Sequence, residues 1–379
     1  MNRVRRLPRP LHPVAWWVWA LGLAVAASRT TNPLLTGLVI AVAAVVVARR
    51  RPEAPWAAGF RMFLVLGLTV VAVRVVLRAL FDGSADGDVW FRLPELPLPD
   101  AAAGIRIGGA VTAQGVLAAV YDGLRLAALI VCFGAASSLA DPKRLLKHLP
   151  GALYELGVAA TVAVTVAPQV VVSAARVRRA QRLRGTTTRR RHGLRALVFP
   201  VLEDALERSV ALAAAMDARG YGRRAAVGPP SRRATAACTL AGLAGVCVGT
   251  YGTLDATAPR ALGLPVLAAG AALATAGLVL AGRRVRRSTY RPEPWRAPEW
   301  GVVACGAVAA VVLVASGVTD ALHPPLQPLT WPSLPPGPTL ALVAAAAAGW
   351  IAPPPEPRPA DDAPLAAARP GHAGEVAVA

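Results

Sequence analysis

The chain has 379 residues, of which 55% are hydrophobic and only 16% are charged. A soluble domain carries about 25% charged residues. This composition therefore excludes an ordinary soluble protein and, with several long uncharged runs, indicates an all-α polytopic membrane protein. The formal net charge of +20 then reflects the Lys and Arg that collect in cytoplasmic loops. Few aromatic residues accompany this charge, so no nucleic acid is expected as a partner.

The first two apolar runs, over residues 14–27 and 34–48, predict a helical hairpin. Its turn covers residues 28–33 and contains Asn-Pro, a dipeptide that favours turns. The first run follows a basic N-terminus, so a signal peptide is the alternative interpretation of that run. The hairpin is favoured because the second apolar run begins almost at once.

Two further apolar runs, over residues 57–80 and 111–139, complete the N-terminal set of predicted spans. Arg74 lies deep within the first of them, so its side chain must face protein or water. Asp122 and Arg125 lie three residues apart in the second, which predicts an ion pair on one helix face. That pair either neutralises itself within the bundle or marks a contact surface for a second membrane subunit.

A hydrophilic region follows, and a short basic helix is expected from Pro142 because Asp141 is placed to cap it. The next stretch, over residues 152–172, is apolar. We interpret it as a helix at the cytoplasmic face, and not as a span, mainly because a span here would place the cationic loops on both sides of the membrane. Its apolar character is also interrupted by Glu155, Pro168 and Gln169. It leads into an Arg-rich segment over residues 176–222.

The C-terminal part contains four further apolar runs, over residues 234–251, 262–281, 300–317 and 339–351. With the first four runs they make eight predicted spans, which place both termini on one side of the membrane. Lys and Arg are concentrated in the segments on that side. The opposite loops contain only four arginines, Arg29, Arg92, Arg106 and Arg260. The positive-inside rule therefore predicts that both termini and the Arg-rich segment are cytoplasmic.

This topology divides the chain into four predicted regions. They are N-terminal transmembrane helices over residues 1–140, a cytoplasmic helical region over 141–233, C-terminal transmembrane helices over 234–351 and a disordered cytoplasmic tail over 352–379. The tail is predicted to be disordered because it is rich in Pro and Ala.

The Arg-rich segment is expected to form two helices that end in the same way. Glycine is a common left-handed cap at a helix C-terminus. The two helices are expected to stop at similar tripeptides, Leu183-Arg184-Gly185 and Ala218-Arg219-Gly220. Two plainer interpretations stay open here. An Arg-Gly end can be ordinary capping chemistry, and the surrounding arginines can attract anionic lipid headgroups.

The second of these helices is expected to begin at Val201, because Pro200 precedes it and acidic residues fill its first turns. Those acidic residues are Glu203, Asp204 and Glu207. Apolar residues recur at helical spacing and predict one apolar face, made by Leu202, Leu206, Val210, Ala213 and Met216.

The segment RVRRAQRLRG, followed by LERSVALAAAMDARGYG, closely resembles the transmembrane T component of energy-coupling-factor (ECF) vitamin and metal importers, the EcfT/CbiQ-like family. That family has paired Ala-Arg-Gly-type motifs at the ends of cytoplasmic coupling helices. The matching positions here are Leu183, Arg184 and Gly185 for the first motif and Ala218, Arg219 and Gly220 for the second. The first motif has Leu where the family pattern favours a small residue. The resemblance covers roughly residues 11 to 252, and the last three spans exceed the usual family pattern.

The resemblance implies a scaffold subunit in a bacterial plasma membrane, in contact with membrane lipids. In the family, the two motif arginines dock into grooves of two ABC-type ATPase subunits, while the membrane helices hold a substrate-binding S component. ATP-driven closure of the ATPases moves the coupling helices and topples the S component, which releases a vitamin or metal ion inward. The resemblance implies no cofactor and no catalytic residue.

The sequence itself agrees that ATP hydrolysis belongs to other subunits. A phosphate-binding loop requires Gly-Lys followed by Ser or Thr. Neither lysine of the chain meets this requirement, because Lys143 is followed by Arg144 and Lys147 by His148. No Cys or His cluster with metal-ligand spacing is present, and the four cysteines lie in apolar runs, where they are expected to pack as small apolar residues.

Two other classes of function remain as alternatives. A polytopic membrane enzyme, such as a lipid or prenyl transferase, needs clustered carboxylates for metal-diphosphate chemistry. The adjacent acidic pairs here are Glu203-Asp204 and Asp361-Asp362, and neither is accompanied by a second cluster at catalytic spacing. The other alternative is a membrane scaffold with no role in transport. The two classes differ from a T component in that neither should co-purify with ABC-type ATPases.

Overall fold

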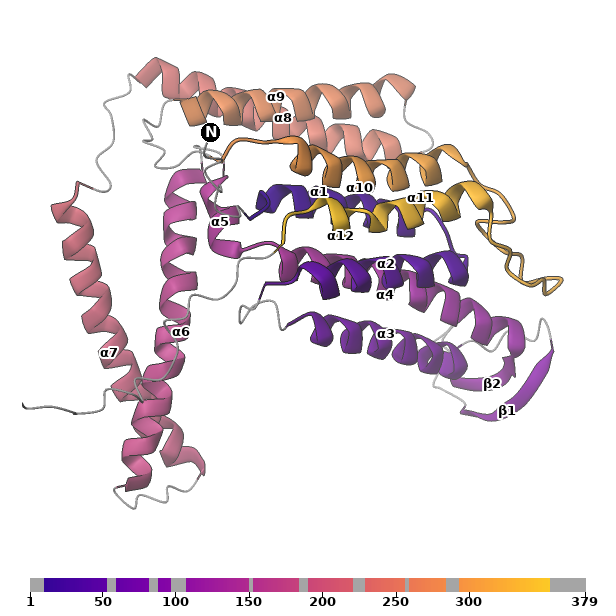
Figure 1. Cartoon of the computed structure of the whole chain (residues 1–379), viewed down its shortest axis with the longest axis horizontal. Helices are drawn as coiled ribbons and strands as arrows, with labels where there is room; N and C mark the ends of the chain where they lie inside the picture. The colour runs from indigo at the N-terminus through magenta and orange to yellow at the C-terminus, as the bar shows by residue number, and fades with distance from the viewer. Residues whose placement is uncertain are drawn as a thin grey trace, which may run out of the picture. The chain divides into compact units, whose positions relative to one another are not determined.

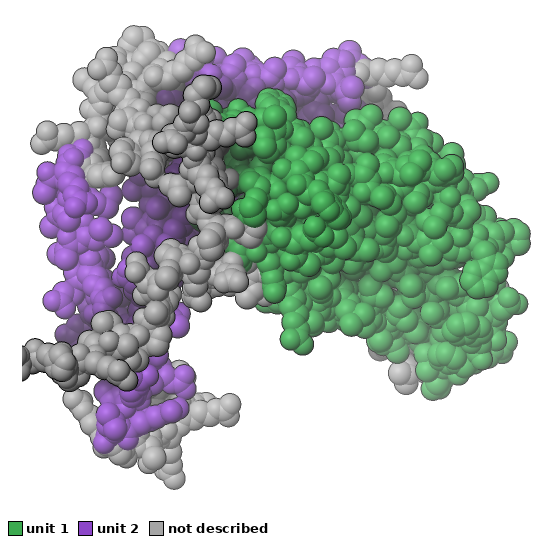
Figure 2. Space-filling model, in the orientation of Figure 1, with its two compact units in different colours: residues 1–142, 293–379 green, residues 143–292 purple. Residues whose placement is uncertain are grey.

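The computed structural model is almost entirely helical and confirms the all-α polytopic class. It describes residues 10–52, 59–81, 88–96, 107–149, 153–183, 190–220, 229–255, 259–283 and 293–354. The described part forms two compact units, one of residues 1–142 and 293–379 and the other of residues 143–292 (Figure 2). The segment after residue 292 therefore belongs to the same unit as the N-terminus.

Within the described residues, seven helices are long and apolar enough to span a membrane. They cover Pro33–Arg50, Phe60–Phe81, Ala113–Leu139, Glu155–Leu183, Arg233–Leu254, Leu264–Gly282 and Ala297–Ala315. Two shorter apolar helices, Pro13–Ser28 and Pro336–Ile351, coincide with the first and last predicted spans. The helix over 155–183 is thus long and apolar enough to span a membrane, although the sequence favours a position at the cytoplasmic face for it.

The first unit is a helical bundle with one small two-stranded sheet (Figure 1). Its elements are α1 (Pro13–Ser28), α2 (Pro33–Arg50), α3 (Phe60–Phe81), β1 (Val89–Leu96), β2 (Ile107–Thr112), α4 (Ala113–Leu139), α10 (Ala297–Ala315), α11 (Pro336–Ala346) and α12 (Ala348–Ile351). Helix α1 packs on α10 and α4, and α2 packs on α4, α11 and α12. The strands pair antiparallel between α3 and α4.

The core of the first unit joins helices from both ends of the chain. Trp19, Leu23, Leu313 and Leu342 are fully buried together. The indole Nε1 of Trp19 donates a hydrogen bond of 3.1 Å to the carbonyl oxygen of Ala345. Burying these large apolar side chains stabilises the bundle, and the indole hydrogen bond satisfies a polar group that would otherwise be costly to bury.

The predicted hairpin of α1 and α2 is confirmed. Asn32 caps α2, because its Oδ1 accepts a hydrogen bond of 2.9 Å from the Leu34 amide, and Pro33 begins the helix. The side-chain amide of the buried Asn32 also donates to the carbonyl oxygens of Ala321 and Ser333, at 2.8 and 2.7 Å. The turn between α1 and α2 is therefore tied to the connection between α10 and α11.

The predicted ion pair between Asp122 and Arg125 is wrong. Asp122 of α4 pairs instead with Arg74 of α3, with 3.2 Å between the guanidinium nitrogen and the carboxylate oxygen. The Arg125 guanidinium donates to the carbonyl oxygen of Ser28. The prediction considered one helix only, whereas α3 packs closely on α4 and brings Arg74 within reach. This contact also confirms that Arg74 faces protein at its position within the span.

The second unit contains two helical pairs. Its elements are α5 (Pro142–Lys147, at the boundary), α6 (Tyr154–Leu183), α7 (Arg190–Ala218), α8 (Pro229–Leu254), the short helix η4 (Arg260–Leu262) and α9 (Leu264–Arg283). Helices α8 and α9 form a hairpin in which Gly245 and Gly249 of α8 lie against the backbone of α9 with no room for a Cβ atom. Small residues at this four-residue spacing allow the close helix contacts typical of membrane spans. The other pair, α6 and α7, contains the candidate site.

Candidate functional site on helices α6 and α7

Helices α6 and α7 cross as an antiparallel pair (Figure 1). Two side-chain contacts define the crossing, one between Ser173 and Asp204 and the other between Gln181 and Ala196. Beyond the first contact α7 continues to Ala218, and beyond the second α6 continues to Leu183. The two helices therefore carry their C-terminal ends away from the crossing in opposite directions.

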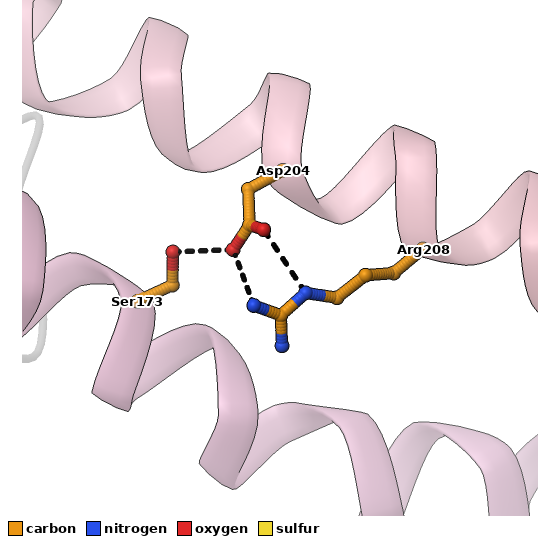
Figure 3. A network of polar contacts seen from close by, with 3 residues as sticks. All are labelled: Ser173, Asp204 and Arg208. Carbon is orange, nitrogen blue, oxygen red and sulfur yellow. Dashed lines mark hydrogen bonds and ion pairs between the residues drawn. The ribbon is translucent and has the colours of Figure 1, made fainter.

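A carboxylate lies at the first of these two contacts, between α6 and α7 (Figure 3). Asp204 Oδ2 accepts a hydrogen bond of 2.6 Å from the hydroxyl of Ser173, which is buried. The Arg208 guanidinium contacts both carboxylate oxygens, with Nε 3.0 Å from Oδ1 and a terminal nitrogen 3.0 Å from Oδ2. A two-point contact of this kind holds the planar carboxylate in one orientation. One carboxylate therefore joins a serine of α6 to an arginine of α7.

The surroundings of Asp204 favour its ionised form. The hydrogen bond from Ser173 lowers the pKa of the Asp204 carboxyl below its ordinary value, and the hydrogen bond and charge of Arg208 and the charge of Arg176 act in the same direction. Partial desolvation raises the pKa of this carboxyl but does not reverse the shift. The Asp204 carboxyl is therefore ionised at neutral pH, and the guanidinium of Arg208 balances its charge.

The expected start of the second helix at Val201 is wrong. Helix α7 begins at Arg190 and includes Pro200 in its interior. Proline has no N–H, so the carbonyl oxygen of Ala196, four residues earlier, lacks its usual partner within the helix. The side-chain amide of Gln181 donates to that oxygen at 2.7 Å. A contact from α6 thus accommodates the proline in α7, which the sequence of α7 alone does not indicate.

The second predicted tripeptide, Ala218-Arg219-Gly220, stands at the C-terminal end of α7. Ala218 is the last residue of α7, and the amides of Arg219 and Gly220 donate to the carbonyl oxygens of Met216 and Asp217, at 3.1 and 2.9 Å. Gly220 has a φ of +76°, so the predicted left-handed cap is confirmed. Arg219 is exposed at this helix end.

The first predicted motif is described only at its first residue. Leu183 is the last residue of α6, and 84% of its surface is exposed. Arg184 and Gly185 lie outside the described residues. The described part of α6 thus reaches the residue immediately before the Arg-Gly pair.

The predicted apolar face of α7 does not pack on α6. Leu202, Leu206 and Val210 are 52%, 65% and 67% exposed, and the neighbouring Phe199 is also exposed. Large apolar side chains exposed one after another along a helix are typical of a surface that a partner or lipid covers. The helix therefore presents an arginine at its end and an apolar stripe along its side.

Sequence reasoning missed the residues that hold the crossing together. The four-residue spacing of Asp204 and Arg208 could have indicated their pairing. Nothing in the sequence pattern indicates that Ser173 or Gln181 reaches α7. Among the described residues, no group of His, Cys, Asp and Glu is arranged to hold a metal ion.

Comparison with protein families finds that residues 2–227 match the model described as "CbiQ: Cobalt transport protein". The match covers more than half of the chain, and it contains both helix-ending tripeptides and the whole crossing of α6 and α7. The helices after α7 lie beyond it. No curated protein matches the chain.

Proposed function

Because the chain belongs to the CbiQ cobalt transport protein family and is a membrane transporter component, we propose that it is the transmembrane scaffold, or T component, of an ATP-driven ECF-type importer. In this role it couples ATP hydrolysis by two ABC-type ATPase subunits to the movement of an S component that carries a vitamin or metal ion. The family match across both helix-ending tripeptides is the observation that carries the proposal.

The two ATPase subunits dock on the two ends of the crossing. Leu183, Arg184 and Gly185 form one contact and Ala218, Arg219 and Gly220 the other. The described geometry supports one ATPase at each end, because the two helices carry these ends in opposite directions. At 1.5 Å per residue, Leu183 lies about 15 Å along α6 from Ser173 and Arg219 lies about 22 Å along α7 from Asp204. An arginine offers five donors in a rigid fork, which suits the carboxylates and carbonyls of a docking groove.

The crossing lies at the cytoplasmic face of the plasma membrane, and both termini are cytoplasmic. Helix α7 is too polar to be a candidate span, and it contacts α6 through Ser173, more than halfway along that helix. A polar partner at this depth supports an interfacial α6, and the arginines in the last turns of α6 suit a cytoplasmic surface. Residues 1–140 and 234–351 then supply the transmembrane helices, and residues 352–379 a cytoplasmic tail.

The S component selects the substrate and contacts the membrane helices and the coupling region. The exposed stripe of Leu202, Leu206 and Val210 supports such a contact, because it offers an apolar surface beside the arginine-bearing end of α7. Displacement of the helix ends by the ATPases is then passed along rigid helices to the S component.

The test is co-purification and uptake with the motif arginines replaced. The double variant Arg184→Ala with Arg219→Ala should lose ATP-dependent uptake and ATPase binding while keeping its level in the membrane. The matched control removes two arginines of the same segment, Arg189→Ala with Arg191→Ala, which are expected to contact headgroups. Normal uptake in the motif variant, or failure of the unmodified protein to co-purify with ATPases, would sink the assignment.

A further inference from the structure

Proline at position 200 turns a backbone group of α7 into a binding partner for α6. In an unbroken helix the amide of residue 200 would donate to the carbonyl oxygen of Ala196. Pro200 has no such amide, so this oxygen is available, and Gln181 Nε2 donates to it at 2.7 Å. The acceptor that Gln181 uses is therefore created by the residue at position 200.

This contact is matched by the contact between Ser173 and Asp204. Gln181 lies eight residues after Ser173 on α6, and Ala196 lies eight residues before Asp204 on α7. The two contacts are therefore in register on antiparallel helices and about 12 Å apart along each axis. A single contact leaves two crossed helices free to rotate about it, whereas two separated contacts fix their relative orientation.

Apolar packing at the crossing is too limited to fix the angle by itself. Val201 and Ser173 are buried there, but most side chains around them are exposed, including Val171, Val172 and Leu202. Polar contacts are directional, so a small interface with two short hydrogen bonds is held in a narrower range of angles than an apolar contact of the same size.

We propose that Gln181 and Pro200, with Ser173 and Asp204, form a two-point latch that fixes the crossing of α6 and α7 and so positions the two coupling motifs relative to each other. This inference rests on the proposed function, because it assigns the latch a role in transport. Without the latch the two helices would rotate about their contact. Displacement of one motif would then change the crossing angle between α6 and α7 and would not move the other motif. With the latch the pair moves as one body.

The test measures both geometry and transport. The native cysteines are replaced, and spin labels are placed at two exposed positions, Ala180→Cys on α6 and Ala214→Cys on α7. Electron spin resonance then gives the distribution of distances between the labels, in the T component alone and in the assembled importer. Gln181→Leu should broaden this distribution in both and lower the kcat of uptake about fivefold, as expected for the loss of one hydrogen bond. The KM should not change, because substrate binds elsewhere.

The matched control is Thr165→Val, which replaces an exposed side chain of the same helix whose hydrogen bond stays within α6 and should behave as the unmodified protein. The variant Pro200→Ala distinguishes two explanations. Either the hydrogen bond between the helices matters, or the carbonyl oxygen of Ala196 only needs some hydrogen-bond donor. An alanine at this position would supply its own amide to the carbonyl oxygen of Ala196, so Pro200→Ala should not restore Gln181→Leu if the bond between the helices matters. Restoration of the distances and of kcat in the double variant would overturn the latch.

The latch and the proposed function fail in different ways. If the unmodified protein neither binds ATPases nor supports uptake, the proposed function fails, while the label distances still test the geometry. If uptake is ATP-dependent but Gln181→Leu leaves both the distances and kcat unchanged, the latch is refuted and the proposed function stands.

Discussion

At the scale of single residues, Asp204 shows how two neighbours keep a carboxylate ionised where helices meet. The Ser173 hydroxyl and the Arg208 guanidinium both favour its charged form and lower its pKa. A carboxylate whose folded pKa is lowered stabilises the folded state at every pH above its unfolded value, about 3.9 for aspartate. This contribution is lost only as pH falls from that value through the lower folded pKa.

The pH dependence of the crossing follows from this sign. The distance between labels on α6 and α7 should be constant from about pH 8 to about pH 5. Asp204→Asn should broaden the distribution of distances between the labels at neutral pH. The neutral amide attracts Arg208 less, and the Ser173 hydroxyl no longer bonds to a charged group. Asp217→Asn, farther along the same helix, is the control. Broadening that sets in near pH 6 would contradict the assignment to Asp204.

At the scale of elements, helix contacts in the first unit depend on the absence of side chains. Gly306 of α10 lies against the backbone of Trp19, and a Cβ atom at position 306 would be 2.6 Å from the Trp19 Cα atom. Gly22 of α1 meets Gly306 in the same way. This closeness lets the fully buried Trp19 reach the carbonyl oxygen of Ala345.

Gly306→Ala should therefore destabilise the first unit. Overpacking at a tight contact costs about 1–3 kcal/mol, because α1 and α10 must separate to admit the methyl group. The measurement is the thermal unfolding temperature of the purified protein in detergent. Gly337→Ala is the matched control, since nothing lies within 4 Å of a Cβ atom at that position. Equal unfolding temperatures for the two variants would show that α1 and α10 can separate to admit the methyl group without loss of stability.

Elements could be predicted from the sequence where the signal is local, and not where it depends on a second element. Asn32 and Pro33 indicate a turn and a helix start by their own chemistry, and Gly220 indicates a helix end. The interior position of Pro200 depends on Gln181 of another helix, and the partner of Asp122 depends on the packing of α3. The expectations for both residues are wrong because periodicity describes one helix at a time.

At the scale of the whole molecule, the chain builds one unit from its two ends. The family match stops at residue 227, yet α10, α11 and α12 share a core with α1 and α2. Arg50 adds a further link, because its Nε donates to the carbonyl oxygen of Gly349 at 2.7 Å. The C-terminal helices, which lie beyond the family match, are thus a structural part of the N-terminal bundle.

Truncation tests this dependence. A chain ending after residue 292 loses α10 to α12 and exposes the buried face of α1, so its level in the membrane should fall at least about tenfold, since several large core residues lose their contacts. A chain ending after residue 354 keeps every described helix and should accumulate normally. Membrane levels are compared by immunoblotting with an N-terminal tag. Equal levels of the two truncated proteins would refute the dependence.

The hydrogen bonds of Asn32 have a consequence for the order in which the protein is made. Its side-chain amide donates to the carbonyl oxygens of Ala321 and Ser333, which leave the ribosome 289 and 301 residues after it. During synthesis the first hairpin must therefore enter the membrane with these bonds unmade, because all of α3 to α10 is synthesised before its permanent partners. Biogenesis of this protein cannot be completed strictly from the N-terminus to the C-terminus: its oldest hairpin is among the last parts to mature.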